Sequence, residues 1–206
     1  MNLLLLGATG RVGKEILKLA ERDGHQVTAF VRTPEKSGSK GPNVRLFKGD
    51  ARNKQDVERA MKGQDAVISA LNTDKTTTLS EATSLLIDAM KKENVERIIT
   101  VGTAGILQSR TDPDILRYRS SESKRKSTAA AEEHEKAYRL LEHSNLAWTI
   151  VCPTYLPDGE ATGSFRAEKN VLPVDGKKIS VGDTAAFTYS QLTDSGYLRT
   201  RVGISY

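Results

Sequence analysis

Hydrophobic residues occur along this chain in short uninterrupted runs, and most runs are followed by a segment with helical spacing. The first run, Leu3–Leu6, leads directly into Gly7, and the apolar residues after the turn are three to four positions apart. An uninterrupted apolar run is typical of a strand buried in a parallel sheet, whereas spacing of three and four marks one face of a helix. The pattern therefore predicts a strand, a glycine turn and a helix at the start of the chain.

The same alternation continues along the chain. It predicts strands at 26–31, 44–48, 65–71, 95–101, 146–151 and 198–204, and helices at 56–62, 79–92, 128–143 and 184–192. Asp175-Gly176, between the short runs 170–174 and 177–181, predicts a hairpin. Strands that alternate with helices predict an α/β fold, a doubly wound parallel sheet with helices on both faces and ligands at the carboxyl ends of the strands. We expect one domain, 1–206, with small substrate-side elements from about 152 onward.

Glycines at positions 7, 10 and 13 follow the first strand in the order G-x-x-G-x-x-G, a variant of the dinucleotide-binding fingerprint. Unpaired N–H groups at a helix N-terminus attract a pyrophosphate, and glycine lets the backbone approach it closely. Three glycines alone are weak evidence, but the strand before them and the helix after them strengthen it. We therefore expect Gly7, Gly10 and Gly13 to form a phosphate-binding turn.

Residues at the ends of the next two strands are candidates for binding the rest of a dinucleotide. Arg32 stands nineteen residues past Gly13, where an NAD-binding domain places an acid on the ribose 2′-hydroxyl. A guanidinium pairs instead with a 2′-phosphate, so Arg32 favours NADP(H) over NAD(H) unless it is an ordinary exposed arginine. Asp50 either accepts from the adenine amino group or caps a turn. Lys36 and Lys40 add positive charge nearby.

Two later features belong to the reacting end of such a site. Thr103 follows the fifth strand, where its hydroxyl can meet the nicotinamide or a substrate. The polar stretch 108–127 is longer than most connections, which suggests a substrate-side flap or a mobile loop. Its basic residues either attract an anionic substrate or are simply solvated; they are Arg117, Arg119, Lys124, Arg125 and Lys126.

Composition narrows the class of protein. The net charge of +5 favours anionic ligands, and without a helix-turn-helix, zinc or aromatic RNA-binding pattern we expect a phosphorylated cofactor rather than nucleic acid. The lone Cys152 permits no intrachain disulfide, and we expect a buried thiol rather than a nucleophile. His134 and His143 are nine residues apart, on opposite sides of one helix, so we expect no metal site. With no apolar run long enough for a membrane span or a signal peptide, we expect a cytoplasmic protein.

The motifs together resemble a known family. GATGRVG, Arg32, Gly49-Asp50, DAVISAL, VGTAG and EEHEKAYRLLEHSNLAWTIVCPTYLPDG occur in the order found in the atypical short-chain dehydrogenase/reductases. The chain is most similar to the NAD(P)H-flavin reductase and biliverdin-IXβ reductase group, close to the NmrA-like proteins. The resemblance spans nearly the whole chain and is weakest at 108–127. It implies a Rossmann fold with strand order 3-2-1-4-5-6, usually with a seventh strand.

The resemblance also implies roles for individual residues. It places the pyrophosphate on Gly7, Thr9, Gly10, Arg11 and Val12, the 2′-phosphate on Arg32, and the adenine on Asp50 and Ala51. At the other end of the cofactor it places Leu71 and Asn72 beside the nicotinamide ribose, Thr103 and His134 beside the nicotinamide, and Pro153, Thr154 and Tyr155 over it. Tyr155 stands where the biliverdin reductases carry histidine, which leaves the substrate preference open.

One absence bears on the reaction. No tyrosine in this chain is followed four residues later by a lysine, so the Tyr-Lys pair that protonates an alkoxide in other short-chain dehydrogenases is missing. A flavin or a linear tetrapyrrole accepts a hydride and takes its proton from solvent. We therefore expect an NADPH-dependent reductase of a planar small-molecule acceptor, acting as a monomer or homodimer. The alternative is an NmrA-like regulator that senses NADP(H) without turnover.

Overall fold

The computed structural model describes residues 1–34, 41–123 and 127–206, so the expectations for Lys36, Lys40, Lys124, Arg125 and Lys126 fall outside the described residues. Eight strands form one sheet in the order β3-β2-β1-β4-β5-β6-β8-β7. The strands are β1 (Asn2–Leu6), β2 (Gln26–Val31), β3 (Val44–Lys48), β4 (Ala66–Ser69), β5 (Arg97–Val101), β6 (Ala147–Pro153), β7 (Arg166–Lys169) and β8 (Thr200–Ser205). All pairs are parallel except β7 with β8, which confirms the expected order 3-2-1-4-5-6.

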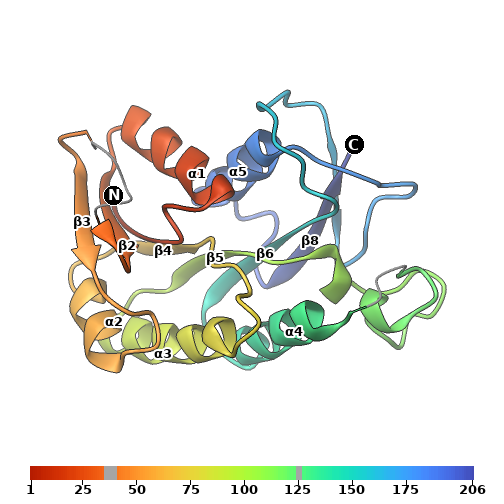
Figure 1. The fold of residues 1–206 in the computed structure, drawn as a ribbon, viewed down its shortest axis with the longest axis horizontal. Helices are drawn as coiled ribbons and strands as arrows, with labels where there is room; N and C mark the ends of the chain where they lie inside the picture. Colours follow the sequence, from red (N-terminus) through yellow and green to blue (C-terminus); the bar gives the residue numbers. More distant parts are fainter. Residues whose placement is uncertain (35–40, 124–126) are drawn as a thin grey trace.

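Helices cover both faces of this sheet. The five α-helices are α1 (Arg11–Arg22), α2 (Lys54–Met61), α3 (Thr78–Glu93), α4 (Ala129–Glu142) and α5 (Val181–Ser190). Figure 1 shows α1 and α5 side by side above the sheet and α2, α3 and α4 below it. The doubly wound α/β fold predicted from the alternation is therefore confirmed.

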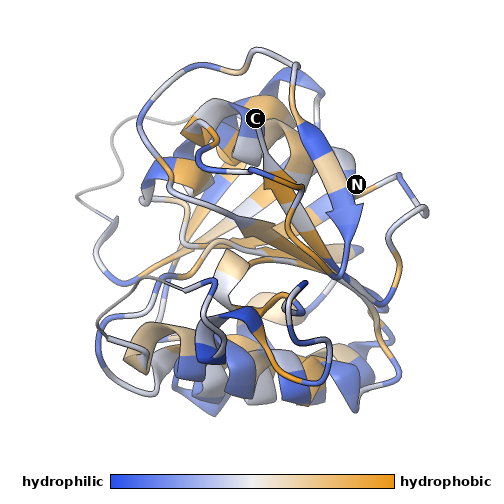
Figure 2. Ribbon diagram, turned by 90° about the vertical axis from the view of Figure 1, so that its right-hand side faces the viewer, coloured by the Kyte–Doolittle hydropathy of each residue, from blue (hydrophilic) through white to orange (hydrophobic). Residues whose placement is uncertain are grey.

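The core lies between these layers because the central strands are apolar on both faces. Leu4 and Leu6 pack with the α2–α4 layer, whereas Leu3 and Leu5 pack with α1 and α5. All four leucines are at most 1% exposed. Figure 2 shows hydrophobic strands between helices whose outward faces are hydrophilic. Burial of both faces explains why these strands read as continuous apolar runs instead of alternating ones.

The hairpin predicted around Asp175-Gly176 is wrong. A turn does form there, with the Gly176 N–H bonded to the Pro173 carbonyl at 3.0 Å, but neither flanking run is a strand. Proline cannot donate to a ladder, and Asn170 has a positive φ of 62°, so the first run cannot pair regularly. The antiparallel strand of this region is the short, charged β7, which lies before the predicted hairpin and pairs with β8, more than 30 residues later in the chain.

The stretch 108–127 contains little regular structure in its described part, which ends at 123 and resumes at 127. Gln108 forms single bridges to Leu116 and Val171, and a 3₁₀ turn spans Arg117–Arg119. Leu116 and Tyr118 are buried against Ala131 of α4. This packing holds the segment beside the carboxyl ends of β5 and β6.

Candidate active site

The carboxyl ends of β1, β2 and β4 surround a cavity of about 300 Å³. Since these strands are parallel neighbours, their ends lie in one row along the sheet edge, as expected for a ligand site in this fold. The cavity is lined by six of the residues predicted to bind the pyrophosphate and adenosine, which are Gly7, Thr9, Gly10, Arg32, Asp50 and Ala51. Leu71 and Asn72, predicted to lie beside the nicotinamide ribose, line the same cavity.

The glycine turn has a geometry that other residues cannot adopt. Gly7 has φ +78°, and a Cβ there would lie 2.4 Å from the Ala70 carbonyl oxygen. At Gly13 a Cβ would lie 2.1 Å from the Gly7 carbonyl oxygen, so α1 can approach β1 this closely only with glycine. Gly10, the N-cap of α1, provides no side-chain cap. The first-turn N–H groups of α1 are thus left without a side-chain acceptor, as a phosphate-binding turn requires.

Arg32 ends β2 at the rim of the cavity, and its side chain is exposed. Asp50 lies beside it, and its carboxylate accepts the Arg52 N–H at 2.9 Å. Asp50 therefore does cap a turn, the second of its two expected roles, while still lining the cavity. Arg52 also lines the cavity and was missed by the sequence reasoning, although its place four residues after the end of β3 and two after Asp50 is a usable signal.

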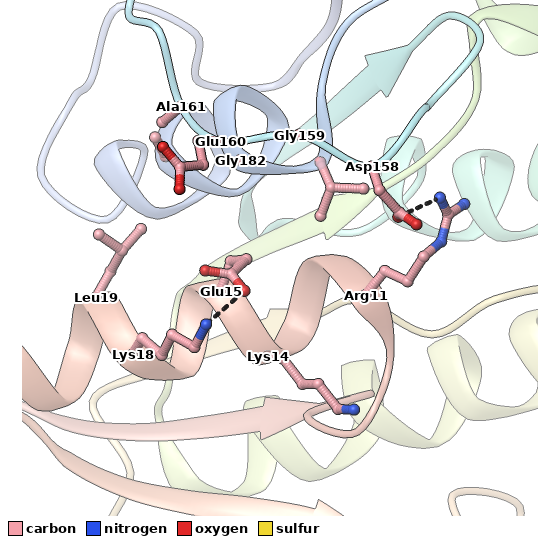
Figure 3. Close-up of a pocket in the computed structure, with 12 residues that line it drawn as sticks. Arg11, Lys14, Glu15, Lys18, Leu19, Asp158, Gly159, Glu160, Ala161 and Gly182 are labelled. Carbon is pink, nitrogen blue, oxygen red and sulfur yellow. Dashed lines mark hydrogen bonds and ion pairs between the residues drawn. The ribbon is translucent and has the colours of Figure 1, made fainter.

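Arg11 and its neighbours are placed differently from the other turn residues. The Arg11 guanidinium donates to the Leu156 carbonyl at 2.9 Å and pairs with Asp158 at 3.0 Å (Figure 3). It lines a separate cavity of about 660 Å³ between α1 and the segment 158–161. Val12 is buried in the core on α1, and neither it nor Gly13 lines the 300 Å³ cavity. The structure therefore does not bring the side chains of Arg11 and Val12 to the predicted pyrophosphate position.

A second cavity, of about 410 Å³, lies at the ends of β5 and β6. Thr103 lines it from one side, and its hydroxyl accepts the Gly105 N–H at 3.5 Å. Thr154 and Tyr155 line it from the other, with Tyr155 69% exposed, while Pro153 is buried at the end of β6. The Thr154 hydroxyl oxygen is buried and has no hydrogen-bond partner among the described residues. A buried hydroxyl without a partner is costly, so it fits a ligand group that would occupy this cavity.

His134 lies behind this cavity and does not line it. It is buried on α4, not on the helix surface, and borders a much smaller space together with Thr83, Thr100 and Gly102. Thr103 and His134, both predicted to lie beside the nicotinamide, thus line different cavities. His134 borders the same small space as Thr100, near the end of β5.

Two buried phenols, those of Tyr118 and Tyr138, and the thiol of Cys152 are poor proton donors. Burial, reinforced by the hydrogen bond to Glu142, raises the pKa of Tyr138 to about 12. Burial also raises the pKa of Tyr118, whose hydroxyl donates to Glu135 at 2.6 Å. Cys152 is fully buried, which confirms the expected buried thiol, and burial raises its pKa to about 12. None of these three groups can exchange a proton readily near neutral pH.

The residues present fit a nicotinamide dinucleotide. The turn without Cβ atoms and without a side-chain cap suits the pyrophosphate, and the unpartnered Thr154 hydroxyl suits a polar group at the far end. Residues 7–195 match the family model described as NAD(P)H-binding. The chain belongs to this NAD(P)H-binding family.

Known proteins and solved structures are similar to this chain over most of its length. YwnB of Bacillus subtilis, an uncharacterized protein, is 29% identical over 93% of this chain and 92% of its own. A Streptomyces griseus (4-alkanoyl-5-oxo-2,5-dihydrofuran-3-yl)methyl phosphate reductase is 26% identical over 95% of this chain, which covers 64% of the reductase. The structure of a candidate NADH-flavin reductase from Streptococcus pneumoniae superposes with a TM-score of 0.82 at 27% identity, covering 100% of this chain and 99% of its own. These similarities support the resemblance to atypical short-chain dehydrogenase/reductases.

No helix in 1–34, 41–123 or 127–206 is long and apolar enough to cross a membrane. The same residues contain no group of three or more His, Cys, Asp or Glu side chains placed to hold a metal ion.

Proposed function

We propose that this NAD(P)H-binding protein is an NADPH-dependent reductase that transfers a hydride to a flat conjugated acceptor, such as a flavin, a linear tetrapyrrole or a quinone. The observation that carries the proposal is the pair of cavities along one sheet edge, one at the glycine turn and Arg32 and one between Thr103 and Tyr155. Because β1, β4, β5 and β6 are parallel neighbours, an extended dinucleotide laid along this edge reaches from the first cavity to the second. The names of the S. pneumoniae and S. griseus proteins, a candidate NADH-flavin reductase and a phosphate reductase, support the same class of reaction.

The bound dinucleotide would supply the hydride, and the protein would supply alignment. Thr103 and Thr154 line the second cavity, where they would orient the nicotinamide and the acceptor. His134 would act by positioning the end of β5 from behind. Since Tyr118 and Tyr138 donate to carboxylates and have raised pKa values, the proton that completes the reduction would come from water. An acceptor that needs no enzymic acid fits this site better than a simple ketone.

Exchange of Arg32 for an acid tests the cofactor preference. A guanidinium–phosphate contact is worth roughly 1.5–3 kcal/mol, so Arg32→Asp should raise the KM for NADPH at least 10-fold and leave the KM for NADH nearly unchanged. Arg45→Asp is the matched control, because Arg45 lies on the neighbouring β3 and does not line the cofactor cavity. Equal losses with both cofactors would refute the role of Arg32.

A screen of NADPH oxidation with FMN, riboflavin, biliverdin and quinones tests the reaction itself. Oxidation with at least one of these acceptors is the expected result. Tight NADPH binding without oxidation by any of them would favour the alternative, a regulator that senses NADP(H) through a partner protein.

A further inference from the structure

The guanidinium of Arg117 is held at the second cavity with part of its hydrogen-bonding capacity unused. Its Nε is buried and has no hydrogen-bond partner among the described residues, while one Nη donates to the Glu122 carbonyl at 3.3 Å. A buried N–H group of a cation without an acceptor is unfavourable, and native structures seldom keep one unless a ligand or an ordered water completes it. Arg117 lines the same cavity as Thr103 and Thr154. A ligand in this cavity would therefore lie against the side chain of Arg117.

Arg119, two residues away, provides the contrast. Its Nε donates to the Tyr118 hydroxyl at 2.7 Å, and its terminal nitrogen pairs with Glu135 at 2.8 Å. It does not line the cavity. The 3₁₀ turn thus directs one arginine to the surface, where it is neutralised, and the other to the cavity.

The charges around the cavity favour an anion. Lys177, an exposed residue on the opposite wall, adds a second cation. Glu122 is the acidic residue among the described lining residues. Burial raises the pKa of Glu122, but the hydrogen bonds from Ser109 and the Arg110 N–H and the charge of Arg117 outweigh this effect. The pKa is therefore lowered, and Glu122 is ionised. Two cations facing one carboxylate leave a positive cavity.

The N-terminus of α4 points its dipole at the same place. Thr128, the N-cap, and Ala131 in the first turn line the cavity, and the Thr128 side chain makes no capping hydrogen bond. A helix N-terminus carries about half a positive charge, which adds to that of Arg117. The Thr128 hydroxyl is engaged by Glu132, which lies outside the cavity lining.

We propose that the electron acceptor carries an anionic group, a phosphate or a carboxylate, and that Arg117 binds this group, with Lys177 and the N-terminus of α4 in support. The inference rests on the proposed reductase function and narrows its substrate class. Arg117 then discriminates among flat acceptors by their tail, while Thr103 and Thr154 align the ring that accepts the hydride. An acceptor without an anionic tail would leave the Arg117 N–H unsatisfied.

Two pairs of acceptors that differ only in the anionic group test this inference. FMN and riboflavin share one ring system and differ by a phosphate, whereas biliverdin and its dimethyl ester differ by two carboxylates. Steady-state kcat/KM with NADPH should favour the anionic member of at least one pair by roughly 10- to 100-fold, the range expected for charge-assisted hydrogen bonds. The preferred pair then identifies the anion as phosphate or carboxylate.

Arg117→Gln should abolish the preference, mainly by raising the KM for the anionic acceptor with kcat little changed, because the tail is bound equally in the ground and transition states. Arg119→Gln, the matched control, should retain the preference. If Arg117→Gln does not fold, Lys177→Gln against Lys178→Gln gives an independent test, since Lys177 lines the cavity and Lys178 does not. A preference reduced several-fold in Lys177→Gln alone would then support the inference.

Failure of the inference can be separated from failure of the proposed function. Reduction of both members of each pair at equal efficiency, or a preference that survives Arg117→Gln, would overturn the inference while the reductase function stands. If no acceptor is reduced, the reductase function fails. The anion site is then tested by titrating FMN or riboflavin with the protein and measuring the quenching of flavin fluorescence. Tighter binding of FMN than of riboflavin that is lost in Arg117→Gln supports the anion site, whereas equal or absent binding overturns it.

Discussion

Asp183, on the first turn of α5, is fully buried and makes five hydrogen bonds through its two carboxylate oxygens. Oδ1 accepts the N–H groups of Thr162 and Gly163, each at 2.8 Å. Oδ2 accepts three hydroxyls, those of Thr162 at 2.9 Å, Ser180 at 3.1 Å and Tyr206 at 2.6 Å. One carboxylate thus joins the segment after β6, the start of α5 and the C-terminal residue. We expect it to be among the largest single polar contributions to stability.

The partners of the two Asp183 oxygens predict different losses of stability for two substitutions of this residue. In Asp183→Asn the amide oxygen can keep both N–H groups, and hydroxyls can turn to accept from the new NH₂ group, so the loss is the charge on these bonds and one hydroxyl partner, about 1–2 kcal/mol. In Asp183→Ala two buried N–H groups and the hydroxyls of Thr162, Ser180 and Tyr206 lose this acceptor, so we expect about 3–5 kcal/mol. Tyr206→Phe removes the bond to Asp183 and also the acceptor of the Ser180 N–H, so it should cost about 1–3 kcal/mol.

The pKa of Asp183 determines how its contribution to stability changes with pH. Burial raises the pKa of Asp183, but the hydrogen bonds from Tyr206, Gly163, Thr162 and Ser180 outweigh it, so the folded pKa lies below the ordinary value of 3.8. A group with a depressed folded pKa contributes stability above its unfolded pKa and loses it as the pH falls through the folded value. The difference between wild type and Asp183→Asn should therefore be constant from pH 7 to 5 and shrink below about pH 4.

Urea unfolding followed by the fluorescence of Trp148, the single and buried tryptophan, measures these differences. The reasoning would be refuted if Asp183→Asn were as damaging as Asp183→Ala at pH 7. A gap between wild type and Asp183→Asn that widens on acidification would refute the assigned pKa shift.

Two further substitutions test the candidate site. Gly13→Ala should destabilise the protein by roughly 1–3 kcal/mol and abolish NADPH binding, because its Cβ would overlap the Gly7 carbonyl. Gly24→Ala is the control, because a Cβ there meets open space. It should cost only about 1 kcal/mol, for the left-handed backbone at this position, and leave NADPH binding unchanged. Thr154→Val should leave the thermal midpoint unchanged or raise it, because it removes a buried hydroxyl with no partner among the described residues, yet raise the KM for NADPH several-fold; a lowered midpoint with an unchanged KM would contradict this assignment.

The start of α5 could have been located more accurately from the sequence. Ser180-x-x-Asp183 is a helix-start signal, and Ser180 does cap α5 by accepting the Asp183 N–H at 3.0 Å. The predicted helix begins at residue 184, three residues after the start of α5 at Val181, because Gly182 and Asp183 are expected to precede it. By contrast, no local signal places Lys177 at the second cavity, because it comes from a turn between segments without regular structure.

The residues by themselves determined most of the strands and the glycine turn, because these follow from short-range rules, whereas the sheet order was expected from the resemblance to a known family. An apolar run of Leu3–Leu6 has to be buried on both faces, and Gly7 and Gly13 are required wherever a helix packs this closely on its strand. Such constraints act within a few residues, so they can be read in order along the chain.

Only the tertiary structure decided which polar groups face the cavities. Arg117 and Arg119 are equivalent in a sequence of mixed charges, yet one lines the second cavity and the other pairs with Glu135. Arg11 lies in the glycine motif but pairs with Asp158, which is far away in the chain. A charged side chain goes where a partner or solvent compensates it, and that partner is brought near only by packing of distant segments.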